Sequence, residues 1–481
     1  MPAVVETQRH TFGIQDMKLK ITNTLMRKKQ VFHTIDPLNV RVYVCGPTVY
    51  DYAHVGNARP AVVFDVLVRA LRHIYGNAHV TYVTNITDVD DKIINRSKER
   101  CITMEALTKE IINIYKTDMA AIGVKKPDVQ PRATEYIGPM IAFTQRLINL
   151  GHAYITNNHV LFNVRSTANY GQLSHRYEKD FIAESRIDVL SFKRNPSDFV
   201  LWKPSANDQQ GWDSPWGYGR PGWHVECSAM AADNLGETFD IHGGGIDLIF
   251  PHHENELAQT SCAFGHGTMA NYWMHNGFVT VEGKVMSKSR HNFYTIRDLL
   301  SRWPGEAIRF LLLSTHYRQP LNFSKSGLYE AKTQLNKLYG TINRARESGY
   351  TPQCSLVQDN NLVLSALCDD LNTPLALTAL HQIARKINIA LNNKVCDWEI
   401  SDLMYKLLDW SKLLGLLQSD LKAWFKGDGK EDEEIEALIA ARNAARKAHN
   451  FREADKIRDK FKARGIKLED GAANTTWKKI K

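Results

Sequence analysis

Residues 40–86 read VRVYVCGPTVYDYAHVGNARPAVVFDVLVRALRHIYGNAHVTYVTNI, and this stretch decides the fold class. Residues 40–45 are rich in β-branched and aromatic side chains, which is typical of a buried strand, and the Gly-Pro-Thr that follows is a turn signal. From about Gly56 apolar residues recur every three or four positions, which predicts a helix, and residues 80–86 predict a second strand. A strand, a helix and a strand in this order predict a parallel sheet with a right-handed crossover.

The loop between the first strand and the helix is a candidate ligand site. Ligands of parallel α/β sheets bind beyond the carboxyl ends of the strands, where residues 45–54 would lie. His54 and Asn57 are three positions apart at the expected helix N-terminus, so both could donate toward one phosphate, and Gly56 would let a ligand approach the backbone closely. The alternative for a single histidine at this position is a helix cap.

The overall composition excludes several classes of protein. The chain has 481 residues, of which 43% are hydrophobic and 23% charged, and this balance excludes a mainly disordered protein. No apolar run approaches the length of a membrane span, and the N-terminal residues lack the apolar core of a secretory signal. Seven thinly spread cysteines suit a reducing compartment. We therefore expect a cytoplasmic protein that does not insert into a membrane.

Changes in periodicity and composition predict several segments. Residues 131–213 are mixed and polar, residues 214–222 are rich in Pro and Gly, residues 327–417 have helical periodicity, and residues 426–430 read as a linker. The expected segments are an N-terminal extension (1–16), an α/β domain in two halves (17–130 and 214–326), an insertion between them (131–213), a helix bundle (327–425) and a small basic C-terminal domain (431–481).

The positive charge of the chain is concentrated near its C-terminus. The net charge is +9, and between Arg442 and Lys467 ten basic residues face three acidic ones, which gives +7 within that segment. Such a patch suits a polyanion, with RNA or DNA ahead of a membrane surface. The alternative is an ordinary solvated helix face.

Four scattered residues are candidate metal ligands. His252 and Glu256 are four positions apart after Pro251, which would suit the first turn of a helix, so their side chains would share a face. Together with Cys45 and Cys227 they would offer Zn²⁺ a tetrahedral shell of two sulfurs, a nitrogen and an oxygen. The alternative is a pair of buried apolar cysteines and a solvated helix face.

The tetrapeptide Met286-Ser287-Lys288-Ser289 follows a strand-like stretch at residues 277–281. Small and hydroxylated residues around a lysine suit a mobile loop that brings a cation onto phosphate oxygens. Taken alone, such a tetrapeptide carries little information.

Longer motifs turn these separate observations into a family resemblance. The strand–HVGN–helix unit and the MSKS loop resemble those of class I aminoacyl-tRNA synthetases. The sequence is similar to the cysteinyl-tRNA synthetases in particular, in the stretches YVCGPTVYDYAHVGNAR, NITDVDDKI, KRNPSDFVLWK, SPWGYGRPGWHVECSAM, FDIHGGGIDLIFPHHENELAQ, NYWMHNGFV and YRQPLNFS. The similarity runs from about Met17 to the C-terminal LEDGAANTTWKK. It implies a Rossmann-like catalytic domain with an insertion, then a helix bundle and a small RNA-binding domain.

The resemblance also implies roles for individual residues. The implied zinc ligands, one ion per chain, are Cys45, Cys227, His252 and Glu256. The implied catalytic residues are His54, Asn57 and Lys288. The implied contacts to ATP, which would bring Mg²⁺, are His54, Asn57, Gly243, Gly244, Gly245, Asp247, Met286, Ser287, Lys288 and Ser289. The implied contacts to L-cysteine are Gly46, Thr48, Thr87, Trp223 and His242.

The implied activity is that of a cysteine–tRNA ligase, which forms cysteinyl-adenylate from ATP and transfers cysteine to the 3′-terminal ribose of tRNA(Cys). We expect the zinc ion to recognise the substrate thiolate, because a serine hydroxyl does not ionise readily at neutral pH, and no editing domain would then be needed. The resemblance suggests a monomer. Two alternatives are a ligase that passes the adenylate to a small amine and a non-catalytic RNA-binding protein with structural zinc.

The sequence departs from the family pattern in its second signature. The family reads KMSKS followed by Leu-Gly-Asn, whereas Val285 precedes the MSKS here and Arg290-His291 follow it. The catalytic lysine is retained, so we expect activity, with an altered closure of the loop over ATP.

Overall fold

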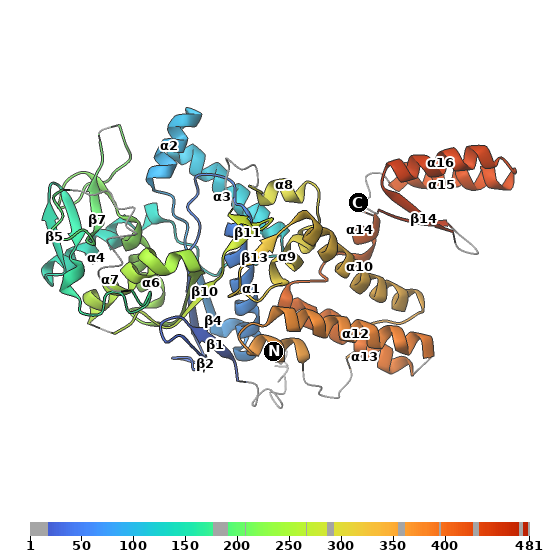
Figure 1. The fold of residues 1–481 in the computed structure, drawn as a ribbon, viewed down its shortest axis with the longest axis horizontal. Coiled ribbons are helices and arrows are strands. Elements are labelled where there is room, and N and C mark those ends of the chain that lie inside the picture. The colour runs from blue at the N-terminus through green and yellow to red at the C-terminus, as the bar shows by residue number, and fades with distance from the viewer. Residues whose placement is uncertain are drawn as a thin grey trace, which may run out of the picture.

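The computed structural model describes residues 18–176, 191–206, 208–265, 267–285, 293–354, 361–393, 396–426, 432–470 and 475–479. The expected extension (1–16), the loop residues Met286, Ser287, Lys288 and Ser289, and the departures at Arg290 and His291 lie outside the described residues. The described part is elongated. A lobe of short strands and helices lies at one end, a parallel sheet in the middle, and helices followed by a small module at the other end (Figure 1).

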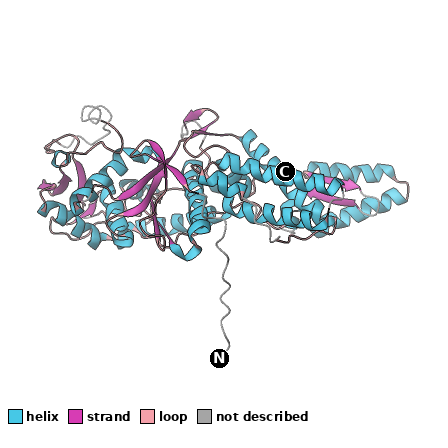
Figure 2. Ribbon diagram, turned by 90° about the horizontal axis from the view of Figure 1, so that it is seen from below, coloured by secondary structure: helices cyan, strands magenta, loops and turns pink. Residues whose placement is uncertain are grey.

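A four-stranded parallel sheet forms the centre of the molecule (Figure 2). In spatial order its strands are β10 (Ala270–Asn276), β9 (Phe239–Gly245), β3 (Val40–Val44) and β4 (Val80–Thr84). Helix α1 (Val55–Tyr75) connects β3 to β4, and Val40 pairs with Val80. The predicted βαβ unit and parallel sheet are therefore confirmed. The chain leaves β3 toward β4 but later returns to its other side as β9, so the carboxyl ends of β3 and β9 form the switch point where ligands bind in such sheets.

Helices cover both faces of this sheet. On one face α1 buries apolar side chains such as Val62 and Val66, each worth about 1.5–3 kcal/mol when removed from water. The same face carries α9 (Gly305–Leu313). On the other face lies α6 (Trp223–Leu235), which packs against α4 (Ile137–Asn149) and α7 (Glu254–Phe264). This sandwich holds the strand ends rigidly, which is what a site at those ends requires.

Residues 153–221 contribute a second, antiparallel sheet in the lobe at one end of the molecule (Figure 1). Its strands are β5 (Ala153–Thr156), β6 (His159–Phe162), β7 (Phe199–Pro204) and β8 (Gly219–Pro221). A hairpin of β1 (Lys20–Asn23) and β2 (Lys28–Val31) precedes the central sheet, and helices α2 (Asp91–Arg100) and α3 (Met104–Ala121) follow β4. A small sheet of β11 (Val279–Val281), β12 (Lys284–Val285) and β13 (Leu321–Phe323) follows β10.

The C-terminal half is helical. Its helices are α8 (Ile296–Leu300), α10 (Lys325–Glu347), α11 (Leu362–Cys368), α12 (Thr373–Asn393), α13 (Asp397–Leu414) and α14 (Leu421–Lys426). The last module consists of α15 (Asp432–Lys447), α16 (Phe451–Ala463), β14 (Ile466–Asp470) and β15 (Thr475–Lys479), and it has an apolar core of its own. Among the described residues, no helix combines the length and the apolar character needed to cross a bilayer.

Two local features bear on the expected site. The run Gly243 to Gly245 forms the end of strand β9. Phe250 has an extended backbone (φ −137°, ψ 132°), which kinks the chain, and its bond to Pro251 is cis. Pro251 directly follows this kink, at the start of the turn that leads into α7, and His252 and Glu256 lie one turn apart.

Candidate functional site

His54 caps helix α1 at the carboxyl end of β3. Its Nδ1 accepts hydrogen bonds from the backbone N–H groups of Gly56 (3.1 Å) and Asn57 (3.3 Å), and the Asn57 side chain accepts one from the His54 N–H (3.2 Å). A neutral imidazole that accepts at Nδ1 carries its proton on Nε2. The ring is thus both the helix cap and a potential donor at Nε2, on the wall of the cavity that His54 lines.

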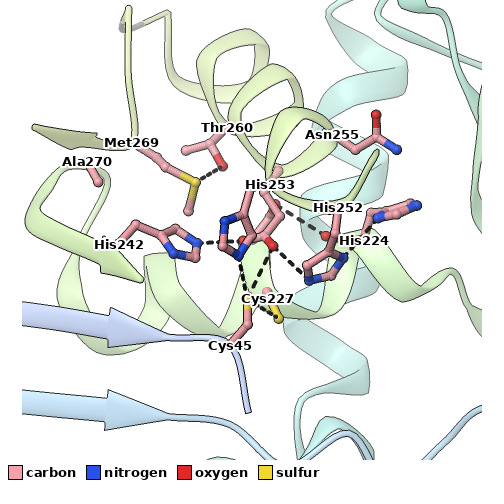
Figure 3. A network of polar contacts seen from close by, with 12 residues as sticks. Cys45, His224, Cys227, His242, His252, His253, Asn255, Thr260, Met269 and Ala270 are labelled. Carbon is pink, nitrogen blue, oxygen red and sulfur yellow. Dashed lines mark hydrogen bonds and ion pairs between the residues drawn. The ribbon is translucent and has the colours of Figure 1, made fainter. Parts of the chain in front are cut away.

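The four predicted metal ligands come from different elements and converge on one point. Figure 3 shows three of them, Cys45, Cys227 and His252, with their side chains directed toward one another. Cys45 follows β3, Cys227 lies on α6, His252 lies in the turn Ile249–His253 and Glu256 lies on α7. One ligand atom from each lies within 4.8 Å of the others. Cys227, His252 and Glu256 are buried, whereas Cys45 is half-buried at the edge of the cavity.

The distances among these atoms are compatible with a tetrahedral ion. Zn²⁺ bonds of about 2.0–2.3 Å place its ligands about 3.3–3.8 Å apart. The two cysteine sulfurs are 3.6 Å apart, and Cys45 Sγ is 3.4 Å from Glu256 Oε1. His252 Nε2 is closer to Glu256 Oε1, at 2.8 Å, which is a hydrogen-bond distance. Two sulfurs, an imidazole and a carboxylate form a donor set that suits zinc.

Burial and close charges perturb the ionisation of this cluster. The hydrogen bond from Cys45 lowers the pKa of Cys227 to about 6, whereas burial raises the pKa of Cys45. Burial alone would lower the pKa of His252, but the Glu256 carboxylate raises it to about 10. Such opposed shifts in one small volume are typical of a functional site.

Sequence reasoning missed three further histidines of the cluster. His253 Nε2 lies 3.3 Å from Cys45 Sγ, and its Nδ1 lies 2.8 Å from His275 Nε2. His224 Nδ1 lies 3.0 Å from His252 Nδ1. Burial lowers the pKa of both His224 and His275 to about 3, so these rings are neutral. Adjacency to predicted ligands in WHVEC and PHHEN was the available signal for His224 and His253, whereas His275 lies far from any predicted ligand in the sequence.

A second group of donors overlaps the first. It consists of Cys45, His242, His253 and Glu256, and it shares Cys45 and Glu256 with the predicted set. His242 Nε2 lies 2.8 Å from Glu256 Oε2. The predicted set contains two thiols and the second only one, so the soft ligands favoured by zinc are concentrated in the predicted set.

A cavity of about 810 Å³ opens beside the cluster and the N-terminus of α1. The predicted residues that line it are Cys45, Gly46, Thr48, His54, Asn57, Trp223, Gly245 and Asp247. The predicted residues Thr87, His242, Gly243 and Gly244 do not line it. Trp223 stacks on His252 with ring centroids 4.2 Å apart and is 40% exposed, so one of its faces is free toward the cavity.

Several predicted residues at and behind the cavity wall are fixed by their packing partners. A Cβ on Gly243 would lie 2.3 Å from the ring of Phe64, so this glycine lets α1 approach β9. A Cβ on Gly46 would lie 1.7 Å from the carbonyl oxygen of Asn85, which requires glycine at the turn after β3. Thr87 is buried and donates to Glu226 Oε2 at 3.1 Å. These contacts fix the backbone around Cys45.

Comparison with known proteins agrees with this arrangement. A family model for the class I (C) tRNA synthetase catalytic domain matches residues 31–333. A cysteine–tRNA ligase from Paramagnetospirillum magneticum is 52% identical over 470 residues, which cover 96% of this chain and all of that protein. The chain belongs to the cysteinyl-tRNA synthetase family.

Further matches extend the family relationship over the C-terminal half. A DALR domain model matches residues 363–418, and a model for the cysteinyl-tRNA ligase anticodon-binding domain matches residues 428–477. A cysteine–tRNA ligase from Rhodospirillum rubrum is 51% identical over 468 residues, with 96% of this chain and 100% of that protein covered. The resemblance, the ligase class and the α/β fold class expected from the sequence are thereby confirmed.

Solved structures of other class I synthetases share the fold. A Mycobacterium tuberculosis methionyl-tRNA synthetase in complex with methionyl-adenylate has a TM-score of 0.56 and 15% identity, and the match covers 83% of this chain and 94% of that one. A LeuRS–tRNA–LeuAMS ternary complex from Agrobacterium radiobacter also has a TM-score of 0.56, with 12% identity and coverage of 82% and 87%. The cysteinyl-tRNA synthetase assignment therefore rests on the sequence relatives, and the structures support the fold.

Proposed function

We propose that the chain activates L-cysteine with ATP and transfers it to tRNA(Cys), and that a zinc ion held by Cys45, Cys227, His252 and Glu256 selects the substrate. One observation carries this proposal. The ligand atoms of these four side chains, drawn from three separate segments of the chain, lie within 4.8 Å of one another at the switch point of the sheet. They do so beside the cavity that His54 and Asn57 line.

Such a site would allow the enzyme to distinguish cysteine from serine. Cysteine and serine differ by one atom, and a pocket that distinguishes small side chains by fit alone reaches only about 10–200-fold. A zinc ion in this donor set would supply Lewis acidity that favours a bound thiolate over a neutral hydroxyl. Because Cys45 lies at the edge of the cavity, a substrate there can approach the cluster from the solvent side.

The protein groups around the cluster would orient the amino acid. Trp223, stacked on His252, would form one wall of the pocket, and Thr48 lines the same cavity. Thr87 and His242 are already hydrogen-bonded to Glu226 and Glu256, respectively. To contact the amine and carboxylate of cysteine, as the resemblance implies, Thr87 and His242 would have to exchange these hydrogen-bond partners. Otherwise they would act indirectly, through the turn at Gly46.

His54 and Asn57 would assist the attack of the cysteine carboxylate on the α-phosphorus of ATP. Negative charge then grows on the phosphoryl oxygens and the leaving pyrophosphate, and preorganised donors stabilise such charge. His54 Nε2 is held as a donor by the two bonds that Nδ1 accepts. Lys288, which lies outside the described residues, would add a cation to the same phosphates, and Mg²⁺ would arrive with the nucleotide. Asp247 and Gly245, on the β9 side, would face the adenosine.

We also propose a tRNA-binding role, an oligomeric state, a cellular location and functional units for the chain, as expected from its sequence. The anticodon-binding module would hold tRNA(Cys), the chain would act as a monomer, and its place would be the cytoplasm. The six segments expected from the sequence would be its functional units.

The proposal is tested by three assays on the purified full-length chain. We expect about one zinc per chain, exchange of pyrophosphate into ATP that depends on cysteine but not on serine, and charging of bulk tRNA with labelled cysteine. Exchange without tRNA charging would instead indicate a ligase for small amines. Zinc without exchange would indicate a binding protein. The variant Lys288→Ala should slow exchange with little change in the affinity for cysteine.

A further inference from the structure

The predicted metal ligand His252 lies in an irregular part of the chain. Between β9 and α7 the backbone of Phe250 is extended (φ −137°, ψ 132°), so the helical hydrogen-bond pattern is interrupted two residues before His252. A side chain that follows such a kink does not take its position from the preceding strand through a regular helix. Contacts from elsewhere in the fold must therefore hold this turn.

Glu254, the first residue of α7, is bound by a loop of the insertion lobe (residues 153–221). We call residues 170–176 the clamp loop. The Gly171 N–H donates to Glu254 Oε1 at 2.9 Å, and the Ser174 N–H donates to Glu254 Oε2 at 2.7 Å. Glu254 is 1% exposed, so backbone donors of the clamp loop satisfy a buried carboxylate. Leu173, in the middle of the loop, is fully buried in the apolar cluster that also contains residues of α7, and this burial fixes the loop itself.

Two further contacts join the clamp loop to the same turn. The Tyr170 hydroxyl donates to Asn255 Oδ1 at 2.5 Å, and Asn255 is buried. The guanidinium carbon of Arg176 lies 5.0 Å from the centroid of the Phe250 ring, which is a cation–π distance. The clamp loop therefore contacts the kinked residue before His252 and the first two residues of α7 after it.

Glu254 lies between two predicted metal ligands in the sequence but contacts the opposite side of the turn. Glu256 faces the metal-ligand cluster, and each residue of a helix is turned by about 100° from the last, so Glu254 projects about 200° away from it. Figure 3 shows the Asn255 side chain likewise directed away from Cys45 and Cys227. The clamp loop thus holds the turn from behind, while His252 and Glu256 face the cluster.

We propose that the insertion lobe positions the metal site through the clamp loop, with Glu254 and Tyr170 as positioning residues for His252 and Glu256. The inference rests on the proposed function, because it requires that the four-ligand set holds zinc. Ligands that must be held within about 0.5 Å of a productive geometry depend on supporting groups. Loss of such groups typically costs about 10–100-fold in metal affinity. Neither Glu254 nor Tyr170 lines the cavity, so neither would contact cysteine or ATP there.

The variant Glu254→Gln tests the proposal in the purified full-length chain. Glutamine has nearly the same size, but its amide has one acceptor oxygen and would turn its own NH2 group toward one of the two backbone N–H groups. We expect the dissociation constant for zinc to rise by about ten-fold, measured without substrates by competition with a chromogenic zinc chelator. Tyr170→Phe removes a single hydroxyl and should raise the same constant by a smaller factor. It keeps the test available if Glu254→Gln does not fold.

The insertion lobe offers matched control variants. Asp198 is also a buried carboxylate that accepts from two backbone N–H groups, those of Val164 (3.0 Å) and Asn195 (3.1 Å), and from the Tyr154 hydroxyl (2.7 Å). All of these partners lie within the lobe. Asp198→Asn and Tyr154→Phe therefore make the same chemical changes without touching the turn at His252, and both should bind zinc as the wild-type chain does.

Pyrophosphate exchange provides a second readout. At limiting zinc, Glu254→Gln should raise the KM for cysteine and lower the preference for cysteine over serine, with the KM for ATP unchanged. Excess zinc should restore the exchange rate, because the substitution weakens the hold on the ion and leaves the ATP side of the cavity intact. A variant that only destabilised the fold would not be rescued by zinc and would not separate the two KM values.

Each result has one interpretation. If folded Glu254→Gln and Tyr170→Phe both bind zinc as tightly as the wild-type chain, the clamp loop does not position the site and the proposal is wrong. If Asp198→Asn weakens zinc binding as much as Glu254→Gln, the effect is a general loss of stability, which also overturns the proposal. If the wild-type chain binds no zinc, the proposed function loses its metal site and this inference falls with it. If Glu254→Gln binds zinc weakly but keeps its preference for cysteine, the positioning role is supported and the proposed role of zinc in selection fails.

Discussion

Arg59 Nη1 donates a hydrogen bond of 2.8 Å to the carbonyl oxygen of Gly277, 218 positions away in the chain. The same guanidinium donates to the carbonyls of Phe278, His316 and Gln319. The side chain is fully buried, and although burial lowers the pKa of Arg59 to about 10, the group stays charged at neutral pH. Arg59 therefore fastens the first turns of α1 to the segment that follows β10.

This contact predicts a positioning role in ATP binding. Residues 276–279 line the cavity, so loss of the guanidinium should let them shift. We expect Arg59→Met to raise the KM for ATP in pyrophosphate exchange more than the KM for cysteine, and to lower the free energy of unfolding by about 3–5 kcal/mol. Arg59→Lys should recover part of the ATP affinity. The control is Arg146→Met, which removes a guanidinium bonded to the Ala263 carbonyl outside the cavity. An unchanged KM for ATP in folded Arg59→Met would refute the role.

His54 has two tasks that one substitution can separate. Asparagine is a strong helix N-cap, so His54→Asn should retain the stability of α1 but lose the Nε2 donor. We expect its cysteine-dependent exchange rate to fall by about 10²–10³-fold, the usual cost of one preorganised donor. His54→Ala should lose the rate and, in addition, about 1 kcal/mol of stability. Thermal unfolding and exchange kinetics on both variants measure this split. Equal stability of the two would show that the cap contributes nothing.

The metal hypothesis predicts a specific loss of selectivity. Cys227→Ser should release zinc, because a serine hydroxyl replaces one of the two soft ligands. The preference for cysteine over serine in adenylate formation should then fall to the roughly 10–200-fold that shape alone supplies. Metal content and exchange with each amino acid provide the readouts, and Cys101→Ser, at an exposed cysteine, serves as the control. Retained selectivity in a zinc-free variant would disprove the metal's role.

The C-terminal module should be needed for tRNA but not for activation. It has its own apolar core, centred on Ile439, Phe461 and Trp477. A chain that ends at Lys426 should therefore keep pyrophosphate exchange and lose much of its tRNA charging efficiency. The remaining charging should depend less steeply on salt, since the basic segment is gone. A parallel loss of exchange would mean that the module supports the catalytic domain instead.

The central fold was predictable because its signals are local. The period-two and period-four apolar patterns of residues 40–86 specify β3, α1 and β4, and turn residues mark their ends. The kink before α7 was not predictable in the same way. Pro251 marks the neighbourhood of a helix start, but the apolar pattern around it does not indicate the extended backbone of Phe250.

The residues of the site could be predicted only where a sequence motif contained them. Spacing brings His252 and Glu256 together, but their approach to Cys45 depends on pairing of β3 with β9 and on the packing of α6, which sequence distance hides. His275 was missed for this reason. The lysines of the cavity, Lys116, Lys125 and Lys126, were also missed, because only the fold brings them to the strand ends.

A buried ion pair predicts the acid sensitivity of the fold. Asp65 of α1 contacts Arg309 of α9, and its Oδ2 also accepts from Arg69 at 2.7 Å. Burial would raise the pKa of Asp65, but the two guanidinium groups outweigh it and lower the pKa below the ordinary value. Such a carboxylate stabilises the fold above its unfolded-state pKa of about 3.9 and loses this contribution as the pH falls through its lower folded-state pKa.

The variant Asp65→Asn leaves Arg309 buried without its partner, so we expect a loss of about 3–5 kcal/mol in the free energy of unfolding at pH 7. The difference between the wild-type chain and the variant should then shrink at acid pH, because protonation removes the same charge from the wild-type chain. Urea unfolding at neutral and at acid pH measures both quantities. Asp402→Asn, which removes a partly buried carboxylate paired with Lys406 on one helix, is the control and should cost less, since Lys406 can still reach water. A difference that stays constant down to the lowest pH would show that Asp65 acts through its shape and hydrogen bonds and not through its charge.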